Sequence, residues 1–154
     1  MHLYKKIINK LIKKNITIST AESCTGGVLA YSITKNKDSS KIYKGGYITY
    51  SNELKVKDLN VRNRTLKKYG AVSKEIANEM VRGLFMKTKT NICISTTGIA
   101  GPGGGSKGKP IGLVYIGIMV NGKVEILQKN FRGSRTEIQK KSVNSIFMHL
   151  SKLI

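Results

Sequence analysis

Apolar residues recur every three or four positions in several segments of the chain. This is the spacing of a helix that buries one face. At the N-terminus Ile7, Ile8, Leu11 and Ile12 follow it, with lysines between them. The helices that this spacing predicts cover about residues 2–14, 24–35, 52–58, 64–69, 73–89 and 134–153.

Short apolar runs between these helices predict strands. The predicted strands cover about residues 16–19, 45–50, 91–96, 111–120 and 123–131, and residues 37–43 read as a polar loop. Asn121 and Gly122 separate the last two runs, and this pair is a strong signal for a hairpin. Helices alternate first with strands, and a hairpin and a final helix follow. We therefore expect an α/β fold, a three-layer α/β/α sandwich with a mixed β-sheet.

Length and composition fit one domain over residues 1–154. No apolar run is long enough to cross a membrane, and the basic N-terminal segment reads as a helix rather than a signal peptide. The two cysteines, Cys24 and Cys93, do not make a disulfide framework, so we expect reduced thiols and a cytoplasmic protein. No Cys or His cluster has metal-ligand spacing, so no metal and no cofactor are predicted.

The net charge of +20 raises the question of an anionic partner. Lysines are scattered over almost every segment, however, Lys greatly outnumbers Arg, and Ile and Asn are plentiful while Asp is rare. That composition is typical of drift toward A/T-rich codons. We interpret the charge mainly as a solvated surface, with local roles in holding an anionic substrate, and we expect no nucleic acid and no membrane as partners.

Residues 20–27, TAESCTGG, lie between a predicted strand and a predicted helix. Small hydroxyl residues and a glycine pair at this place expose backbone N–H groups at a helix N-terminus, which is a ready site for an anion or an oxyanion. Ser23 would project its hydroxyl into that site. The alternative is that Ser23 or Thr25 serves only as a helix N-cap.

Lys55 would stand one turn into the short helix that follows the strand ending at Tyr50. A lysine that is shielded from water and near other cations loses its proton closer to neutral pH. It can then activate a serine as a general base. The alternative is that Lys55 is one more surface lysine.

Residues 96–110 form a glycine-rich loop after a buried strand, and both prolines of the chain lie in it. Such a loop can bring N–H groups close to a phosphate or a ring. Gly103, Gly105 and Gly108 match a dinucleotide fingerprint by letter, but the loop leads into a strand and not a helix. Pro110 stands where a Walker A loop needs Ser or Thr, so ATP hydrolysis is rejected.

Other hydrolase patterns are weak. The two histidines lie near the chain ends, so a Ser-His-Asp triad is not expected, and lysine is the natural base for a serine nucleophile here. Glu22 is a candidate to orient Lys55 or the loop. Cys24 is the rival nucleophile, because a thiol pKa can fall near a helix N-terminus.

These segments together resemble the CinA C-terminal domain family, the nicotinamide-nucleotide amidohydrolases. The matching stretches are TAESCTGG at 20–27, GGYITYSNELK at 45–55, YGAVS at 69–73, TGIAGPGGG at 97–105, KPIGLVYIG at 109–117 and, more loosely, FRGSR at 131–135. The resemblance implies an α/β/α fold with a mixed sheet and hydrolysis of nicotinamide mononucleotide to nicotinic acid mononucleotide and ammonia. This reaction belongs to pyridine-nucleotide (NAD) recycling, and many members carry a larger N-terminal domain, so a stand-alone form is expected here.

Residue by residue, the resemblance implies Ser23 as nucleophile, Lys55 as base and Tyr50 as the tyrosine near that lysine. Substrate-binding residues expected from the motifs are Thr25, Gly26, Thr97, Gly98, Gly101 and Arg135.

The chain departs from the family pattern at Gln139, where members usually carry a second Arg; either phosphate binding is weaker or Lys140 substitutes. The alternatives are a non-catalytic nucleotide- or RNA-binding domain, or a relic that contacts a partner chain. The range of pyridine nucleotides and the oligomeric state, a homo-oligomer included, stay open.

Overall fold

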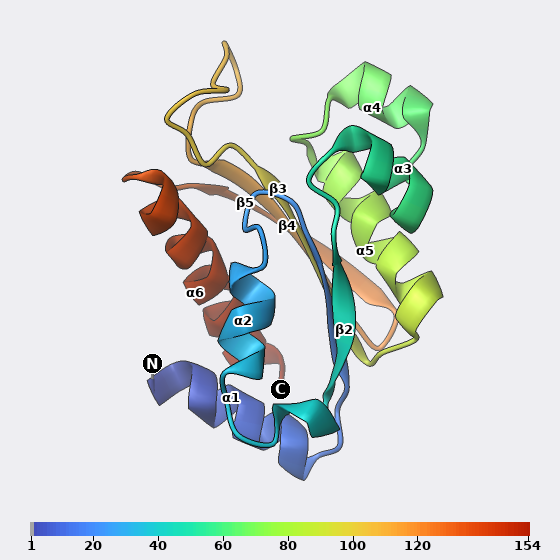
Figure 1. Cartoon of the computed structure of the whole chain (residues 1–154), viewed down its shortest axis with the longest axis vertical. Helices are drawn as coiled ribbons and strands as arrows, with labels where there is room; N and C mark the ends of the chain where they lie inside the picture. The colour runs from blue at the N-terminus through green and yellow to red at the C-terminus, as the bar shows by residue number, and fades with distance from the viewer. Residues whose placement is uncertain (1) are drawn as a thin grey trace.

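The computed structural model describes residues 2–154, which form one five-stranded sheet with helices on both faces (Figure 1). The strands are β1 (Ile18–Glu22), β2 (Tyr43–Ile48), β3 (Ile92–Gly98), β4 (Leu113–Val120) and β5 (Lys123–Asn130). The helices are α1 (His2–Lys13), α2 (Val28–Thr34), α3 (Asn52–Leu59), α4 (Asn63–Tyr69), α5 (Lys74–Thr88) and α6 (Arg135–Leu153), with a 3-10 turn η1 (Ser39–Lys41).

The strand order is β2-β1-β3-β4-β5, and the sheet is mixed. The strands β2, β1 and β3 run parallel, whereas β4 and β5 are antiparallel to their neighbours. The chain leaves β1 through α2 on one face and returns from β2 to β3 through α3, α4 and α5 on the other (Figure 1). Open α/β sheets bind their ligands at such a reversal, outside the carboxyl ends of the parallel strands.

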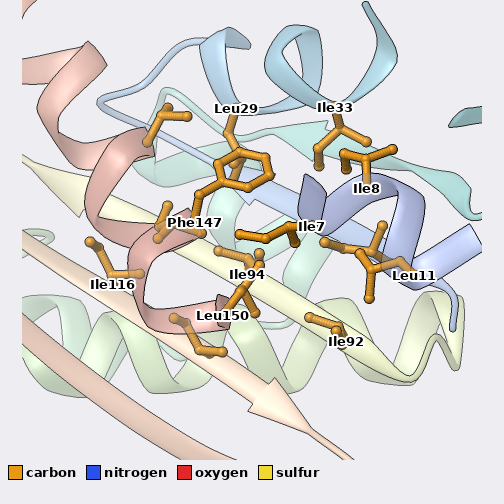
Figure 2. Packing of buried hydrophobic residues seen from close by; sticks show 14 of the residues in the cluster. Ile7, Ile8, Leu11, Leu29, Ile33, Ile92, Ile94, Ile116, Phe147 and Leu150 are labelled. Atoms are coloured by element: carbon orange, nitrogen blue, oxygen red, sulfur yellow. The ribbon is translucent and has the colours of Figure 1, made fainter. Parts of the chain in front are cut away.

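Two apolar cores lie on opposite faces of the sheet. On one face α1, α2 and α6 pack on the strands, as Figure 2 shows for Ile7, Ile8, Leu11, Leu29, Ile33, Ile92, Ile94, Ile116, Phe147 and Leu150. On the other face α5 packs on β3 and β4 through Ile76, Met80, Val81 and Leu84. Burial of each such side chain contributes about 1.5–3 kcal/mol to the free energy of unfolding. The predicted three-layer α/β/α sandwich with a mixed sheet is confirmed.

Several predicted boundaries were wrong in the part of the chain that carries the motifs. The strand expected at 16–19 is β1, which extends to Glu22, and the helix expected at 24–35 begins only at Val28. The strand expected at 45–50 lies at Tyr43–Ile48. The residues between strand and helix therefore form a tight turn that contains Ser23. Among the helices of residues 2–154, none has the length and apolarity needed to cross a membrane.

Candidate active site

A cavity of about 250 Å³ opens at the carboxyl ends of the three parallel strands. Ser23 follows β1, Tyr50 and Lys55 follow β2, and Thr97 and Gly98 end β3. Of the nine residues predicted for the site, the cavity wall contains Ser23, Tyr50, Lys55, Thr97, Gly98, Gly101 and Arg135. Four separate segments of the sequence thus meet at one hollow.

Ser23 and Lys55 are in direct contact. The Lys55 Nζ lies 3.0 Å from the Ser23 Oγ and donates to it. It also donates to the Thr49 carbonyl at 2.8 Å and, at 3.4 Å, to that of Tyr50. When the amine is neutral, the two carbonyls can hold its two hydrogens, and its lone pair then faces the Ser23 hydroxyl. That arrangement is what a general base for a serine requires.

Lys55 is not a surface lysine, because only 1% of it is exposed. Burial lowers the pKa of its ammonium from 10.5 to about 8, because the charged form loses water that the cavity does not replace. No salt bridge to Lys55 exists within residues 2–154. The amine therefore exists in part in its neutral form near physiological pH.

Tyr50 and Arg135 meet at the mouth of the cavity. The Arg135 guanidinium donates to the Tyr50 hydroxyl at 2.6 Å and to the Gly101 carbonyl at 2.7 Å. Tyr50 is 60% exposed, and the Lys55 amine reaches its backbone carbonyl instead of its phenol. Arg135 therefore connects Tyr50, which follows β2, to Gly101 in the glycine-rich loop.

Thr97, Gly98 and Gly101 also line the cavity, at the end of β3 and in the loop that follows it. The Thr97 hydroxyl donates to the Ala71 carbonyl at 2.7 Å, which fixes its orientation. At Gly98 a Cβ would lie 2.6 Å from the Leu113 carbonyl oxygen, so this wall accepts no side chain. Gly101 has a φ of +79°, which favours glycine.

Thr25 and Gly26 do not line the cavity, so the structure does not support them as substrate-binding residues. Thr25 is fully buried, and its hydroxyl donates to the Glu22 carboxylate at 2.7 Å and bonds Thr96 at 2.8 Å. Gly26 is exposed, with a φ of +54°. Both residues shape the turn behind the nucleophile.

The N-terminus of α2 is not free to bind an anion, contrary to the prediction. The buried Glu22 carboxylate accepts from the N–H groups of Gly27, Leu29 and Ala30, at 2.8–3.1 Å. Glu22 therefore orients the turn, and no hydrogen bond joins it to Lys55 within residues 2–154.

We expect Glu22→Gln to lower the free energy of unfolding by about 1–3 kcal/mol, because an amide cannot accept all of these bonds and leaves buried donors unpaired. Urea denaturation measures the loss. Glu53→Gln, on an exposed glutamate of α3, is the matched control. Equal stability of the two variants would contradict the role of Glu22.

Comparison with known proteins identifies the family. The sequence model of the CinA C-terminal domain matches residues 1–154, the whole chain. The chain belongs to this family. A putative competence-damage inducible protein of Clostridium botulinum (strain Loch Maree / Type A3) is 49% identical over 150 residues, which cover 97% of this chain and 37% of that protein. A CinA-like protein of Fusobacterium nucleatum is 48% identical, over 92% of this chain and 34% of its own length.

Solved structures agree with this assignment. The crystal structure of the competence/damage inducible protein CihA from Agrobacterium tumefaciens superposes with a TM-score of 0.95 at 38% identity, covering 99% of this chain and 93% of that one. A CinA superfamily protein from Escherichia coli gives a TM-score of 0.93 at 32% identity, covering 99% of this chain and 88% of that one. This CinA domain therefore spans about a third of the curated relatives' length and most of each of these solved structures.

In this CinA domain Cys24 is poorly suited to be the nucleophile. Burial raises the pKa of its thiol to about 12, so the reactive thiolate is scarce at neutral pH. The expected decrease near a helix N-terminus does not occur, because Glu22 occupies that terminus. The backbone N–H groups of Cys24 and Thr25 donate to no acceptor within residues 2–154.

Gln139 lies behind the nucleophile turn and not in the cavity. Its amide donates to the Cys24 carbonyl at 3.0 Å. Lys140 lines a separate hollow with Tyr31 and Lys35, so it does not take over a contact in the cavity. Gln139, where family members usually carry a second Arg, therefore supports the turn that contains Ser23 and makes no contact in the cavity.

Outside the glycine-rich loop, sequence reasoning missed three residues of the cavity wall. Asn52 belongs to the 45–55 motif, and Ala71 and Val72 belong to the YGAVS stretch, which was noted only as a match. The YGAVS stretch was the signal that could have found Ala71 and Val72. It lies between two helices, so helix formation does not explain why this stretch matches the family. Within residues 2–154, no three His, Cys, Asp or Glu side chains are grouped to hold a metal ion.

Proposed function

We propose that this domain hydrolyses the carboxamide of nicotinamide mononucleotide, giving nicotinic acid mononucleotide and ammonia in pyridine-nucleotide recycling. The observation that carries the proposal is the buried Lys55 amine, 3.0 Å from the Ser23 hydroxyl, with its pKa lowered to about 8. A neutral amine beside a serine at the end of a cavity is the arrangement of an acyl-transfer nucleophile.

The reaction takes place in two steps. Neutral Lys55 accepts the Ser23 proton while the Ser23 Oγ attacks the carboxamide carbon, and the carbonyl oxygen becomes an oxyanion. The C–N bond then breaks, and the Lys55 ammonium returns the proton to the leaving nitrogen, which departs as ammonia. Water, activated by the neutral amine, then hydrolyses the acyl–serine ester to release the carboxylic acid.

The oxyanion needs donors that are already in place. Cys24 lines the cavity and follows the nucleophile directly, with its backbone N–H unpaired, and the N–H of the residue after a nucleophilic serine is a common oxyanion donor. One such donor typically contributes about 3–4 kcal/mol to transition-state stabilisation. The Glu22 bonds to α2 and the Gln139 bond to Cys24 hold this turn rigid.

The electrostatics favour an anionic amide. The net charge of +20 raises the local concentration of anions near the protein. Arg135 stands at the mouth of the cavity, and its remaining N–H groups are available to a phosphate or ribose. A nucleotide is therefore preferred over free nicotinamide.

The test is ammonia release from nicotinamide mononucleotide by the purified chain, with nicotinamide as the matched substrate without ribose phosphate. We expect release from the nucleotide, little from nicotinamide, and no effect of a chelator. A folded protein that releases no ammonia from the nucleotide contradicts the proposal.

Cys24→Ala is expected to keep most of the activity, because the substitution leaves the backbone N–H in place and the thiol is protonated at neutral pH. The measurement is kcat for ammonia release, compared with wild type. Loss of activity in Cys24→Ala together with activity in Ser23→Ala would identify the thiol as the nucleophile instead.

A further inference from the structure

The strand β5 is an open edge of the sheet. It comes last in the strand order, and its pairing partner within residues 2–154 is β4 alone. All of its residues are exposed or half-buried, whereas most of those of β4 are buried. The outer side of such an edge carries a row of backbone N–H and C=O groups that can pair with another strand.

The turn before β5 determines which of its backbone groups point outward. Asn121 and Gly122 have positive φ angles, +49° and +81°, as a two-residue type I′ turn requires. Val120 and Lys123 flank this turn and therefore exchange both of their backbone hydrogen bonds. The pattern alternates along the ladder. The residues whose N–H and C=O groups point away from β4 are thus Val124, Ile126, Gln128 and Asn130.

Two copies of β5 can pair antiparallel about a twofold axis that passes through one residue of the strand. Such an axis places even-numbered positions opposite even-numbered positions, so that their outward groups bond each other. The registers that overlap most of β5 have this axis at one of four residues, Glu125, Ile126, Leu127 or Gln128. Charge distinguishes these registers, because opposite charges that face each other stabilise a strand pair and like charges destabilise it.

Of these four axes, the one at Leu127 alone places opposite charges face to face. It sets Glu125 of each copy opposite Lys129 of the other. An axis at Glu125 sets two carboxylates against each other, and an axis one residue later sets Lys123 against Lys129. An axis one residue beyond Leu127 makes no charge pair.

The charged groups of Glu125 and Lys129 are free for this contact. The Glu125 Oε2 lies 2.6 Å from the His149 Nε2, and the second carboxylate oxygen makes no hydrogen bond or ion pair in the described chain. Lys129 is in none of the ion pairs of residues 2–154. Within one copy the two residues are separated by about 13 Å along the strand, whereas facing residues of two strands are about 4.5 Å apart.

We propose that two copies of this chain associate through β5, paired antiparallel about a twofold axis at Leu127. The two sheets then form one continuous sheet. Leu127 also lines a hollow of about 390 Å³ between β5 and α6, together with Phe131 and Met148, which is 51% exposed. Because Leu127 lies on the axis, the hollows of the two copies meet there. The association does not depend on the reaction at Ser23.

Sedimentation velocity tests the association. At about 0.15 M salt the Debye length is about 8 Å, so the repulsion between two chains of charge +20 is largely screened, while charge pairs in contact persist. We expect wild type to form a dimer. Glu125→Lys and Lys129→Glu each set like charges opposite each other, and each should raise the dissociation constant at least about tenfold. Glu53→Lys and Lys57→Glu make the same charge changes at exposed positions of α3 and should leave the dimer intact.

The register is tested by exchanging the charges. The double variant Glu125→Lys/Lys129→Glu again faces opposite charges and should dimerise like wild type. An equimolar mixture of the two single variants should form heterodimers, since one chain then supplies both lysines and the other both glutamates. A wild type that stays monomeric at about 0.1 mM would overturn the proposal and show that the edge lysines deter pairing. A dimer that neither single variant weakens, or that the double variant does not restore, would overturn the β5 register.

Discussion

Ser23→Ala is expected to lower kcat for ammonia release from nicotinamide mononucleotide by roughly 10⁴- to 10⁶-fold, the range seen when a serine hydrolase loses its nucleophile. The substitution removes the oxygen that forms the acyl–enzyme and leaves the Lys55 amine without its hydrogen-bond partner. The backbone of the turn stays in place, because the Ser23 N–H bonds the Thr96 carbonyl at 3.0 Å. Substrate binding should therefore change little while chemistry stops.

The measurement is single-turnover ammonia release, together with the affinity for the product nicotinic acid mononucleotide. Ser106→Ala is the matched control, since it removes an exposed hydroxyl from the tip of the glycine-rich loop. We expect the control to retain full activity and Ser23→Ala to bind product like wild type. A Ser23→Ala protein with activity within about tenfold of wild type would contradict the assignment of Ser23 as the nucleophile.

The sequence predicted the layers of this fold well because their signal is periodic and local. The stripe of α5 and the Asn121-Gly122 turn both lie where the pattern placed them. The turn around Ser23 was harder, because its geometry depends on where β1 ends. A strand that stops at 19 leaves Glu22 in a loop, whereas β1 carries it into the sheet and aims its carboxylate at α2.

Long-range contacts in the site were also beyond pattern reasoning. Arg135 reaches Tyr50 across 85 positions of the chain, and Gln139 reaches Cys24 across 115. The burial of Lys55 depends on packing against several segments, so composition alone treats it as one more exposed lysine. The resemblance in the motifs pointed to Lys55 where periodicity could not.

Lys55→Met is expected to lower kcat about 10³-fold, the typical contribution of a general base. Methionine keeps the length of the side chain but accepts no proton. Lys55→Arg should be as inactive, because a guanidinium stays protonated. Lys57→Met, an exposed lysine on the same helix, serves as control and should be active.

The dependence of kcat/KM on pH tests whether neutral Lys55 is the base. Below its pKa of about 8 Lys55 is protonated and cannot accept the Ser23 proton, so kcat/KM should fall about tenfold per unit as the pH decreases. Above that pKa the rate should level off. Assays from about pH 7 to about pH 10 would show this limb, and a flat wild-type profile would contradict Lys55 as the base.

The lowered pKa of Lys55 can also be tested without substrate, from the dependence of protein stability on pH. The unfolded chain regains the ordinary lysine pKa of 10.5, whereas the folded chain holds Lys55 at about 8. Between these values the unfolded state binds more protons, so the contribution of Lys55 to the free energy of unfolding rises with pH. The difference in stability between wild type and Lys55→Met should therefore change in favour of wild type as the pH rises through this window. A difference independent of pH would show that the amine titrates alike in both states, and a normal pKa would leave Ser23 without a base near neutral pH.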